Sequence, residues 1–289
     1  MSRKPKKMRI VDFHIHVGKR EHWNPAIHKL FKKLNPGLYE IQNEIMTPEN
    51  IIALLDDSSV DWAIILAEVS PKVTGVVTNE FIAEFCKNHR DRLIPFCSID
   101  PTEDQDPKGT LEHAIKDLGM RGLKLYPTYQ HFYPNAYATS QRMEGLCELY
   151  EKAESLGIPV MFHTGTSIFP GARLKYGNPL FLDDVASDFP KMPVIIVHGG
   201  RGPWFDMAFY VTRLHSNVFL EISGLPPKNL LRYFPQLEVV AERVLFGSDW
   251  PGVPSIADNI EIIQSLEISE KAKAQILGEN AIRLLELES

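Results

Sequence analysis

The chain has few cysteines, no long hydrophobic run and no excess of positive charge. Three of its 289 residues are cysteine, Cys86, Cys97 and Cys147, and their wide spacing makes neither a disulfide framework nor a CxxC metal site. No uninterrupted apolar run approaches the roughly 18 residues that a membrane-spanning helix needs. The net charge of −6 argues against nucleic acid or an anionic membrane as a partner. We therefore expect a cytoplasmic protein with reduced thiols.

The sequence also has no linker rich in proline, glycine and serine. Short apolar segments alternate with amphipathic ones, and we predict eight strands, over residues 9–17, 61–68, 93–99, 121–126, 158–164, 193–200, 218–223 and 243–250. Eight strand–helix units in a chain of this length are typical of a closed (β/α)8 TIM barrel, here as a single domain over residues 1–289. An open doubly wound sheet is the alternative, but no glycine-rich phosphate loop follows the first strand.

Residues 19–46 form a long insertion after the first predicted strand. The insertion is rich in aromatic residues and histidine, namely His22, Trp23, His28, Phe31 and Tyr39. Connections of this length are more often lids or binding loops than simple connectors. We therefore expect a lid-like insertion, which ends where Thr47 and Pro48 mark the start of a helix.

Two histidines stand at the end of the first predicted strand. Residues i and i+2 of a strand point to the same face, so His14 and His16 can direct both imidazoles at one divalent ion. Strands of a parallel barrel are expected to be apolar, and the other polar exceptions also fall at strand ends: Lys124, His163, His198, Glu221 and Asp249. Barrel active sites are built at the carboxyl ends of the strands, so this set predicts a metal site there.

This pattern resembles the amidohydrolase superfamily of metal-dependent barrels. Three strings carry the resemblance to its amidohydrolase-2 branch: VDFHIHVG at Val11, IIVHGG at Ile195 and LFGSDWP at Leu245. The match runs from Met8 to about Leu285. That branch contains hydrolases, decarboxylases such as the aminocarboxymuconate-semialdehyde and resorcylate enzymes, and related hydratases.

The resemblance implies roles for five of the strand-end residues. His14, His16, His163 and Asp249 would ligate the metal, with zinc expected first and manganese as the alternative. His198 would be a further ligand or a catalytic base near the metal-bound water. Asp249 would also be catalytic, as the group that moves a proton to or from that water.

Lys124 has three interpretations. The string LKLYP resembles the strand of dihydroorotase-type enzymes whose lysine is carbamylated and bridges two metals. An unmodified Lys124 would instead bind a substrate carboxylate, or it would form a structural salt bridge. One ion is favoured, and two are expected if Lys124 is carbamylated. Arg201 and Trp250 are further substrate-binding candidates, although Arg201 is as readily explained as a surface or helix-start residue.

We expect a metal-dependent hydrolase that acts on a small carboxylated or cyclic substrate through a metal-activated water. The alternative is a metal-dependent, non-oxidative decarboxylase of an aromatic or unsaturated carboxylic acid. A non-catalytic metal-binding barrel should have lost a ligand position, and none is lost here. A small molecule is the expected partner, and the resemblance also suggests a homodimer.

Overall fold

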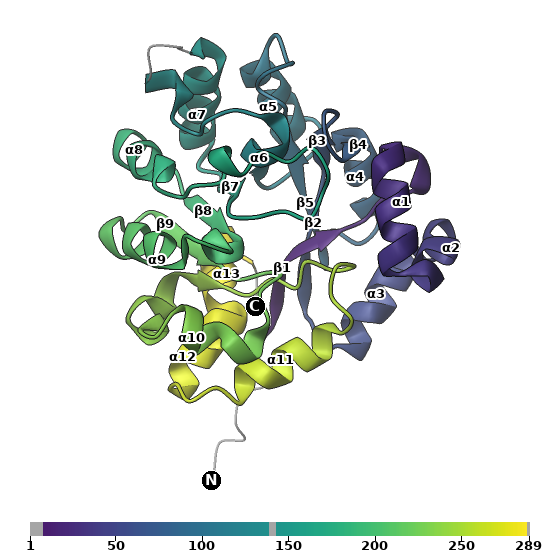
Figure 1. Ribbon diagram of the computed structural model, residues 1–289, viewed down its shortest axis with the longest axis vertical. Helices are drawn as coiled ribbons and strands as arrows, with labels where there is room; N and C mark the ends of the chain where they lie inside the picture. The colour runs from purple at the N-terminus through teal and green to yellow at the C-terminus, as the bar shows by residue number, and fades with distance from the viewer. Residues whose placement is uncertain (1–7, 139–142, 288–289) are drawn as a thin grey trace.

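The computed structural model describes residues 8–138 and 143–287. Within these ranges, eight parallel strands form one sheet in the order β1-β2-β5-β6-β7-β8-β9-β10. Their bounds are β1 Val11–His16, β2 Trp62–Leu66, β5 Leu93–Ser98, β6 Leu123–Leu125, β7 Val160–His163, β8 Val194–Val197, β9 Val218–Glu221 and β10 Val244–Leu245. In Figure 1 the strands lie near the centre and the helices surround them. The predicted α/β TIM-barrel fold is confirmed.

Backbone hydrogen bonds close the barrel between β1 and the chain around β10. Phe13 N donates to Phe246 O at 2.9 Å, and His16 N donates to Trp250 O at 2.9 Å. The predicted strand over residues 243–250 is nevertheless too long, because β10 ends at Leu245. Beyond β10 the chain turns, and Asp249 has a φ of 67°.

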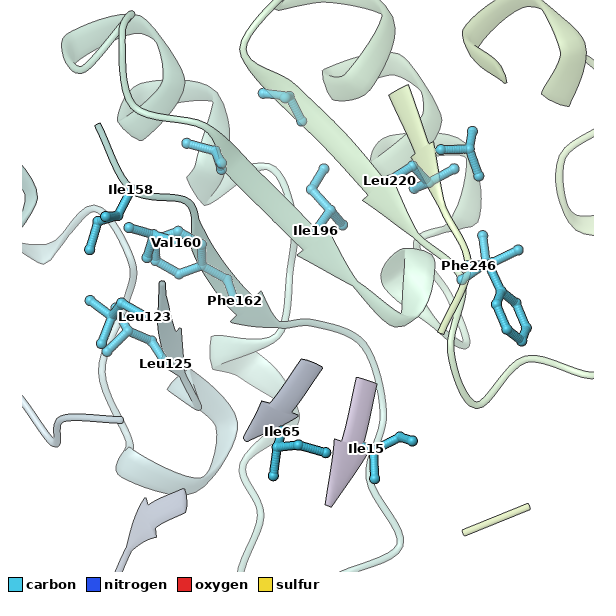
Figure 2. Packing of buried hydrophobic residues seen from close by; sticks show 14 of the residues in the cluster. Ile15, Ile65, Leu123, Leu125, Ile158, Val160, Phe162, Ile196, Leu220 and Phe246 are labelled. Atoms are coloured by element: carbon cyan, nitrogen blue, oxygen red, sulfur yellow. The ribbon is translucent and has the colours of Figure 1, made fainter. Parts of the chain in front are cut away.

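The strands alternate between two apolar layers. Leu123, Val160, Ile196 and Leu220, which Figure 2 shows on their strands, belong to the main hydrophobic cluster together with residues of the surrounding helices. A second cluster, which includes Phe13 and residues from six other barrel strands, fills the interior. Successive side chains of a regular strand face opposite sides, so Lys124, which lies between Leu123 and Leu125, points inward, as does Glu221 beside Leu220.

Helices connect the strands and cover the barrel. Their bounds are α3 Pro48–Asp57, α4 Asn79–Cys86, α5 Pro107–Lys116, α6 Pro127–Gln130, α7 Glu144–Leu156, α8 Phe181–Asp188, α9 Phe205–Leu214, α10 Leu230–Tyr233, α11 Ile256–Gln264, α12 Glu270–Ala274 and α13 Asn280–Leu285. The predicted cap at Thr47 is confirmed, because its side chain accepts a hydrogen bond from Asn50 N at 3.3 Å. No helix in the described residues is both long and apolar enough to cross a lipid bilayer.

The insertion over residues 19–46 is helical rather than an irregular loop. It contains a 3-10 turn at Arg20–His22 and the helices α1 Pro25–Leu34 and α2 Pro36–Ile45. Each α-helix begins with proline at its first position, where the missing N–H costs nothing. Figure 1 places α1 and α2 at one side of the barrel, near α3. The lid role and the single-domain organisation stay predictions.

A two-stranded hairpin that we did not predict supports this insertion. β3 Glu68–Ser70 pairs antiparallel with β4 Gly75–Val77. Asn24, which precedes α1, donates side-chain hydrogen bonds to Pro71 O at 2.9 Å and Val73 O at 3.0 Å. The hairpin therefore ties the start of α1 to the end of β2.

Candidate active site

The predicted histidines and Asp249 come together at the carboxyl ends of the barrel strands. His14 and His16 lie on β1, His163 ends β7, His198 directly follows β8, and Asp249 follows β10. One ligand atom from each of His14, His198 and Asp249 can be chosen so that all three lie within 4.8 Å of one another. The His163 and His198 ring centroids are 4.7 Å apart. The five side chains thus form one cluster.

Three of these side chains have the spacing of ligands around one ion. His14 Nε2 is 3.1 Å from His16 Nε2, and Asp249 Oδ1 is 3.4 Å and 3.6 Å from these two nitrogens. Two nitrogens bound to one tetrahedral ion at about 2.0–2.1 Å lie about 3.3 Å apart. The donor set of imidazole and carboxylate therefore fits a divalent metal.

The protonation of the histidines also suits a metal. Burial, together with the smaller effect of the positive charge of Lys124, lowers the pKa of His16 to about 3. Burial likewise holds the pKa values of His14, His163 and His198 well below the ordinary range. Neutral rings keep a lone pair for a metal. His163 Nε2 is buried without a hydrogen-bond partner, which is costly unless a ligand occupies it.

His198 and Asp249 hold unusual backbone conformations. Their φ angles are 61° and 67°, in the left-handed region that residues other than glycine seldom adopt. Such conformations cost about 1–3 kcal/mol and persist where the surroundings impose them. For Asp249, a hydrogen bond from its backbone N to His14 O at 2.9 Å contributes. Strained residues gather at functional sites, so both conformations support a functional role.

Burial raises the pKa of the Asp249 carboxyl to about 6, while the positive charges of Arg201 and Lys124 oppose the rise. A carboxyl group with a pKa in this range can hold or release a proton near neutral pH. Asp249 is therefore equipped for proton transfer as well as for metal binding.

Three further buried polar residues surround the cluster, and we had assigned none of them a role in the site. Glu68 Oε2 is 3.6 Å from His16 Nδ1, and Glu221 Oε2 is 3.6 Å from His14 Nδ1. Ser223 Oγ lies 2.9 Å from His14 Nδ1. In the sequence, Glu68 and Glu221 each stand at the end of an apolar segment, and this position is the signal that could have identified them as site residues. Nothing in the sequence distinguishes Ser223 from an ordinary loop serine.

Lys124 lies beneath the cluster. Its side chain is fully buried, and Nζ is 3.4 Å from His14 Nε2 and 4.8 Å from the centroid of the Tyr126 ring. Burial lowers the pKa of Lys124 to about 8. Lys124 is not among the cavity-lining residues, so its predicted contact with a substrate carboxylate finds no support in this geometry.

A cavity of about 440 Å³ opens above the cluster. His16, His163, His198 and Asp249 line its floor. Its walls are largely aromatic and apolar, and they come from the 19–46 insertion, α6 and the segment after β7: Trp23, Ile27, Phe31, Tyr126, Tyr129, Ile168 and Phe169. The Phe31 and Phe169 rings, whose centroids are 6.0 Å apart, join the insertion to the opposite wall.

Arg201 carries a permanent positive charge at the cavity, and it is the one lysine or arginine among the lining residues that the structure describes. Thr166 O accepts hydrogen bonds from its Nε at 3.2 Å and its Nη2 at 2.8 Å, which hold the guanidinium in place. Trp250 instead packs against the main hydrophobic cluster. The cavity is lined where we expected Trp250 by the next four residues, Pro251 to Pro254. Its substrate contact stays a prediction.

The comparison with protein families identifies the chain. A family model described as "Amidohydrolase" matches residues 11–287. The chain belongs to the amidohydrolase family. The expected resemblance is thereby confirmed.

This amidohydrolase is similar to known decarboxylases and to solved barrels. It is 22% identical over 318 residues to gamma-resorcylate decarboxylase from Rhizobium sp. (strain MTP-10005), covering 88% of this chain and 92% of the relative. An uncharacterized TIM-barrel protein from Bordetella bronchiseptica superposes with a TM-score of 0.77 at 25% identity, covering 97% and 99% of the two chains. A dihydroxybenzoic acid decarboxylase from Polaromonas sp. JS666, with bound manganese and 2-nitroresorcinol, gives a TM-score of 0.73 at 18% identity, covering 96% and 97%.

Proposed function

We propose that this amidohydrolase is a metal-dependent, non-oxidative decarboxylase of a small hydroxylated aromatic acid. The observation that carries the proposal is that Arg201 and Asp249 both line one aromatic cavity. A cavity of about 440 Å³ suits a one-ring substrate, within the usual range of about 300–1,000 Å³. The similarity to gamma-resorcylate decarboxylases supports the same reaction. The relatives thus favour our alternative prediction over the hydrolase that we expected first.

We propose that His14, His16, His163 and Asp249 would hold one divalent ion, and that His198 lies beside these ligands. The spacing of His14, His16 and Asp249 and the orphaned His163 Nε2 support this assignment. Manganese and zinc are both candidates, and manganese is bound in the Polaromonas structure. When bound, the ion supplies positive charge that neutralises a substrate carboxylate and an adjacent hydroxyl oxygen.

In the proposed reaction, Arg201 binds the substrate carboxylate and the aromatic walls exclude water. Protonated Asp249 gives its proton to the ring carbon that bears the carboxylate, forming a C–H bond there. The bond to the carboxylate carbon then breaks. Its electron pair returns to the ring and restores aromaticity as carbon dioxide leaves. Asp249 regains a proton from solvent, so the reaction consumes one proton for each carbon dioxide released.

Hydrolysis would use the same residues differently. Asp249 or His198 would accept a proton from a water molecule, and the substrate would be an ester, a lactone or an amide. The cytoplasmic location, the homodimer and carbamylation of Lys124 stay predictions from the sequence.

The test uses metal-stripped protein that is reloaded with manganese or zinc. It is incubated with 2,6-dihydroxybenzoate and with 5-carboxyvanillate, and carbon dioxide and the phenolic product are measured. Performed in D2O, the reaction should place one deuterium on the carbon that carried the carboxylate. Asp249→Asn should retain the fold and lose turnover. Hydrolysis of a lactone or an ester by protein that releases no carbon dioxide from either acid would contradict the proposal.

A further inference from the structure

Two buried side chains at the end of β9 take no part in the proposed reaction, yet they contact two of its histidines. Ser223 and Glu221 are both fully buried. Ser223 Oγ lies 2.9 Å from His14 Nδ1, 3.0 Å from His198 Nδ1 and 2.8 Å from Glu221 Oε2. One hydroxyl group therefore contacts both histidine rings, although His14 lies on β1 and His198 follows β8.

The contacts of His198 fix the position of its ring hydrogen. His198 Nδ1 is also 3.0 Å from the backbone carbonyl oxygen of Ser223, which can only accept a hydrogen bond. His198 Nδ1 must therefore carry the hydrogen. A neutral imidazole has one ring hydrogen, so His198 Nε2 keeps its lone pair.

The contacts of Glu221 fix the hydrogen of Ser223. Glu221 accepts hydrogen bonds from the backbone N of Ser223 at 2.9 Å and the backbone N of His198 at 3.1 Å. These backbone donors occupy one acceptor site on each oxygen, and the hydroxyl of Ser223 donates to Glu221 Oε2 at 2.8 Å. Ser223 Oγ then accepts a hydrogen bond from His14 Nδ1, which leaves a lone pair on His14 Nε2.

The surroundings hold this arrangement tightly. A Cβ atom at Gly247 would lie 2.2 Å from Glu221 Oε1 and 2.8 Å from His14 Cβ. Because Gly247 has no side chain, the chain after β10 can pass close to Glu221 and His14. Little free space remains in which Glu221 could turn away from Ser223.

We propose that Ser223, oriented by Glu221, is a positioning residue that sets both His14 and His198 as Nδ1–H tautomers with their Nε2 lone pairs facing the site. This inference deepens the proposed function and rests on its metal site. A group that accepts a hydrogen bond from the other ring nitrogen of a metal-binding histidine fixes the orientation and the tautomer of the ring. Loss of such a group typically lowers metal affinity by about 10- to 100-fold.

The first test measures tautomers in the metal-free wild-type protein. Two-bond ¹⁵N–¹H correlation spectra distinguish Nδ1–H from Nε2–H rings, with each ring assigned through its side-chain carbons. We expect His14 and His198 both as Nδ1–H. An Nε2–H ring at either position overturns the inference, whatever reaction the protein catalyses.

The second test measures zinc affinity by competition with a chelator. Ser223→Ala should bind zinc about 10- to 100-fold more weakly than the wild type, and its His14 tautomer should no longer be fixed. Ser223→Thr keeps the hydroxyl and should restore most of the affinity. The matched control is Ser98→Ala, because Ser98 is also buried at a strand end and its Oγ accepts a hydrogen bond from Val69 N.

The two failures are distinguishable. Unchanged zinc affinity in Ser223→Ala, or equal losses in Ser223→Ala and Ser98→Ala, would overturn the positioning role while leaving the decarboxylase proposal intact. Tight zinc binding by a wild-type protein that releases no carbon dioxide would contradict the proposed reaction and leave the positioning role standing.

Discussion

Replacement of Arg201 tests how the substrate carboxylate is held. Thr166 O already occupies Arg201 Nε and one hydrogen of Nη2. Nη1 and the second hydrogen of Nη2 remain, and Nη1 lies on the same side of the site as Asp249 Oδ2: a Cβ atom built at Gly224 would be 2.8 Å from Nη1 and 2.7 Å from Oδ2. We therefore work the magnitude from one charge-assisted hydrogen bond that Nη1 donates to the carboxylate.

A hydrogen bond to a charged group contributes about 1.5–3 kcal/mol. At about 1.4 kcal/mol for each factor of ten, Arg201→Met should lower kcat/KM by about 10- to 150-fold. Most of the loss should appear in KM, because the carboxylate is present in the ground state as well as in the transition state. Arg201→Lys should recover part of the loss, since the charge returns without the planar fork.

The assay is steady-state kinetics on the metal-loaded protein, combined with equilibrium binding of resorcinol. Resorcinol lacks a carboxylate, so Arg201→Met should bind it as the wild type does. An unchanged KM for the acid, or an equal loss of affinity for the acid and for resorcinol, would refute the assignment of Arg201 as the carboxylate anchor.

Three further predictions concern the barrel and its site. Phe162→Ala removes a fully buried ring from the main cluster and should lower the free energy of unfolding by about 3–5 kcal/mol in a urea titration. Gly224 has a φ of 63°, and the new Cβ of Gly224→Ala would lie 2.7 Å from Asp249 Oδ2. Because Asp249 must then shift, this variant should keep its circular dichroism spectrum but bind zinc about 10- to 100-fold more weakly than the wild type. A zinc affinity equal to that of the wild type would be inconsistent with the packing that we describe. Burial raises the pKa of the Cys97 thiol to about 12, so Cys97 stays protonated at pH 8 and becomes a thiolate only as the pH approaches that value. Iodoacetamide at pH 8 should therefore modify half-buried Cys147 first, as peptide mass spectrometry would show, and early modification of Cys97 would count against its burial.

Local sequence patterns were sufficient for the barrel and for most of the cluster. An apolar segment that ends in a polar residue indicates both a buried strand and the end of the barrel at which its last side chain lies. Four such segments placed His14, His16, His163, His198 and Asp249 at one end before any distance was known. The insertion was harder to predict, because α1 has no side-chain cap hydrogen bond and is held by contacts with the hairpin and the opposite cavity wall, which the local sequence does not show.

The sequence by itself determined the fold, the end of the barrel that carries the site and the residue types at its centre. These depend on strand periodicity and on which side chains interrupt it, and both are local properties. The tertiary structure alone decided that Ser223 contacts His14, 209 residues away in the chain. It also decided that Arg201 lines the cavity while Trp250 packs against the main hydrophobic cluster. Such contacts depend on barrel closure and on the left-handed turns at His198 and Asp249, which no periodic pattern encodes.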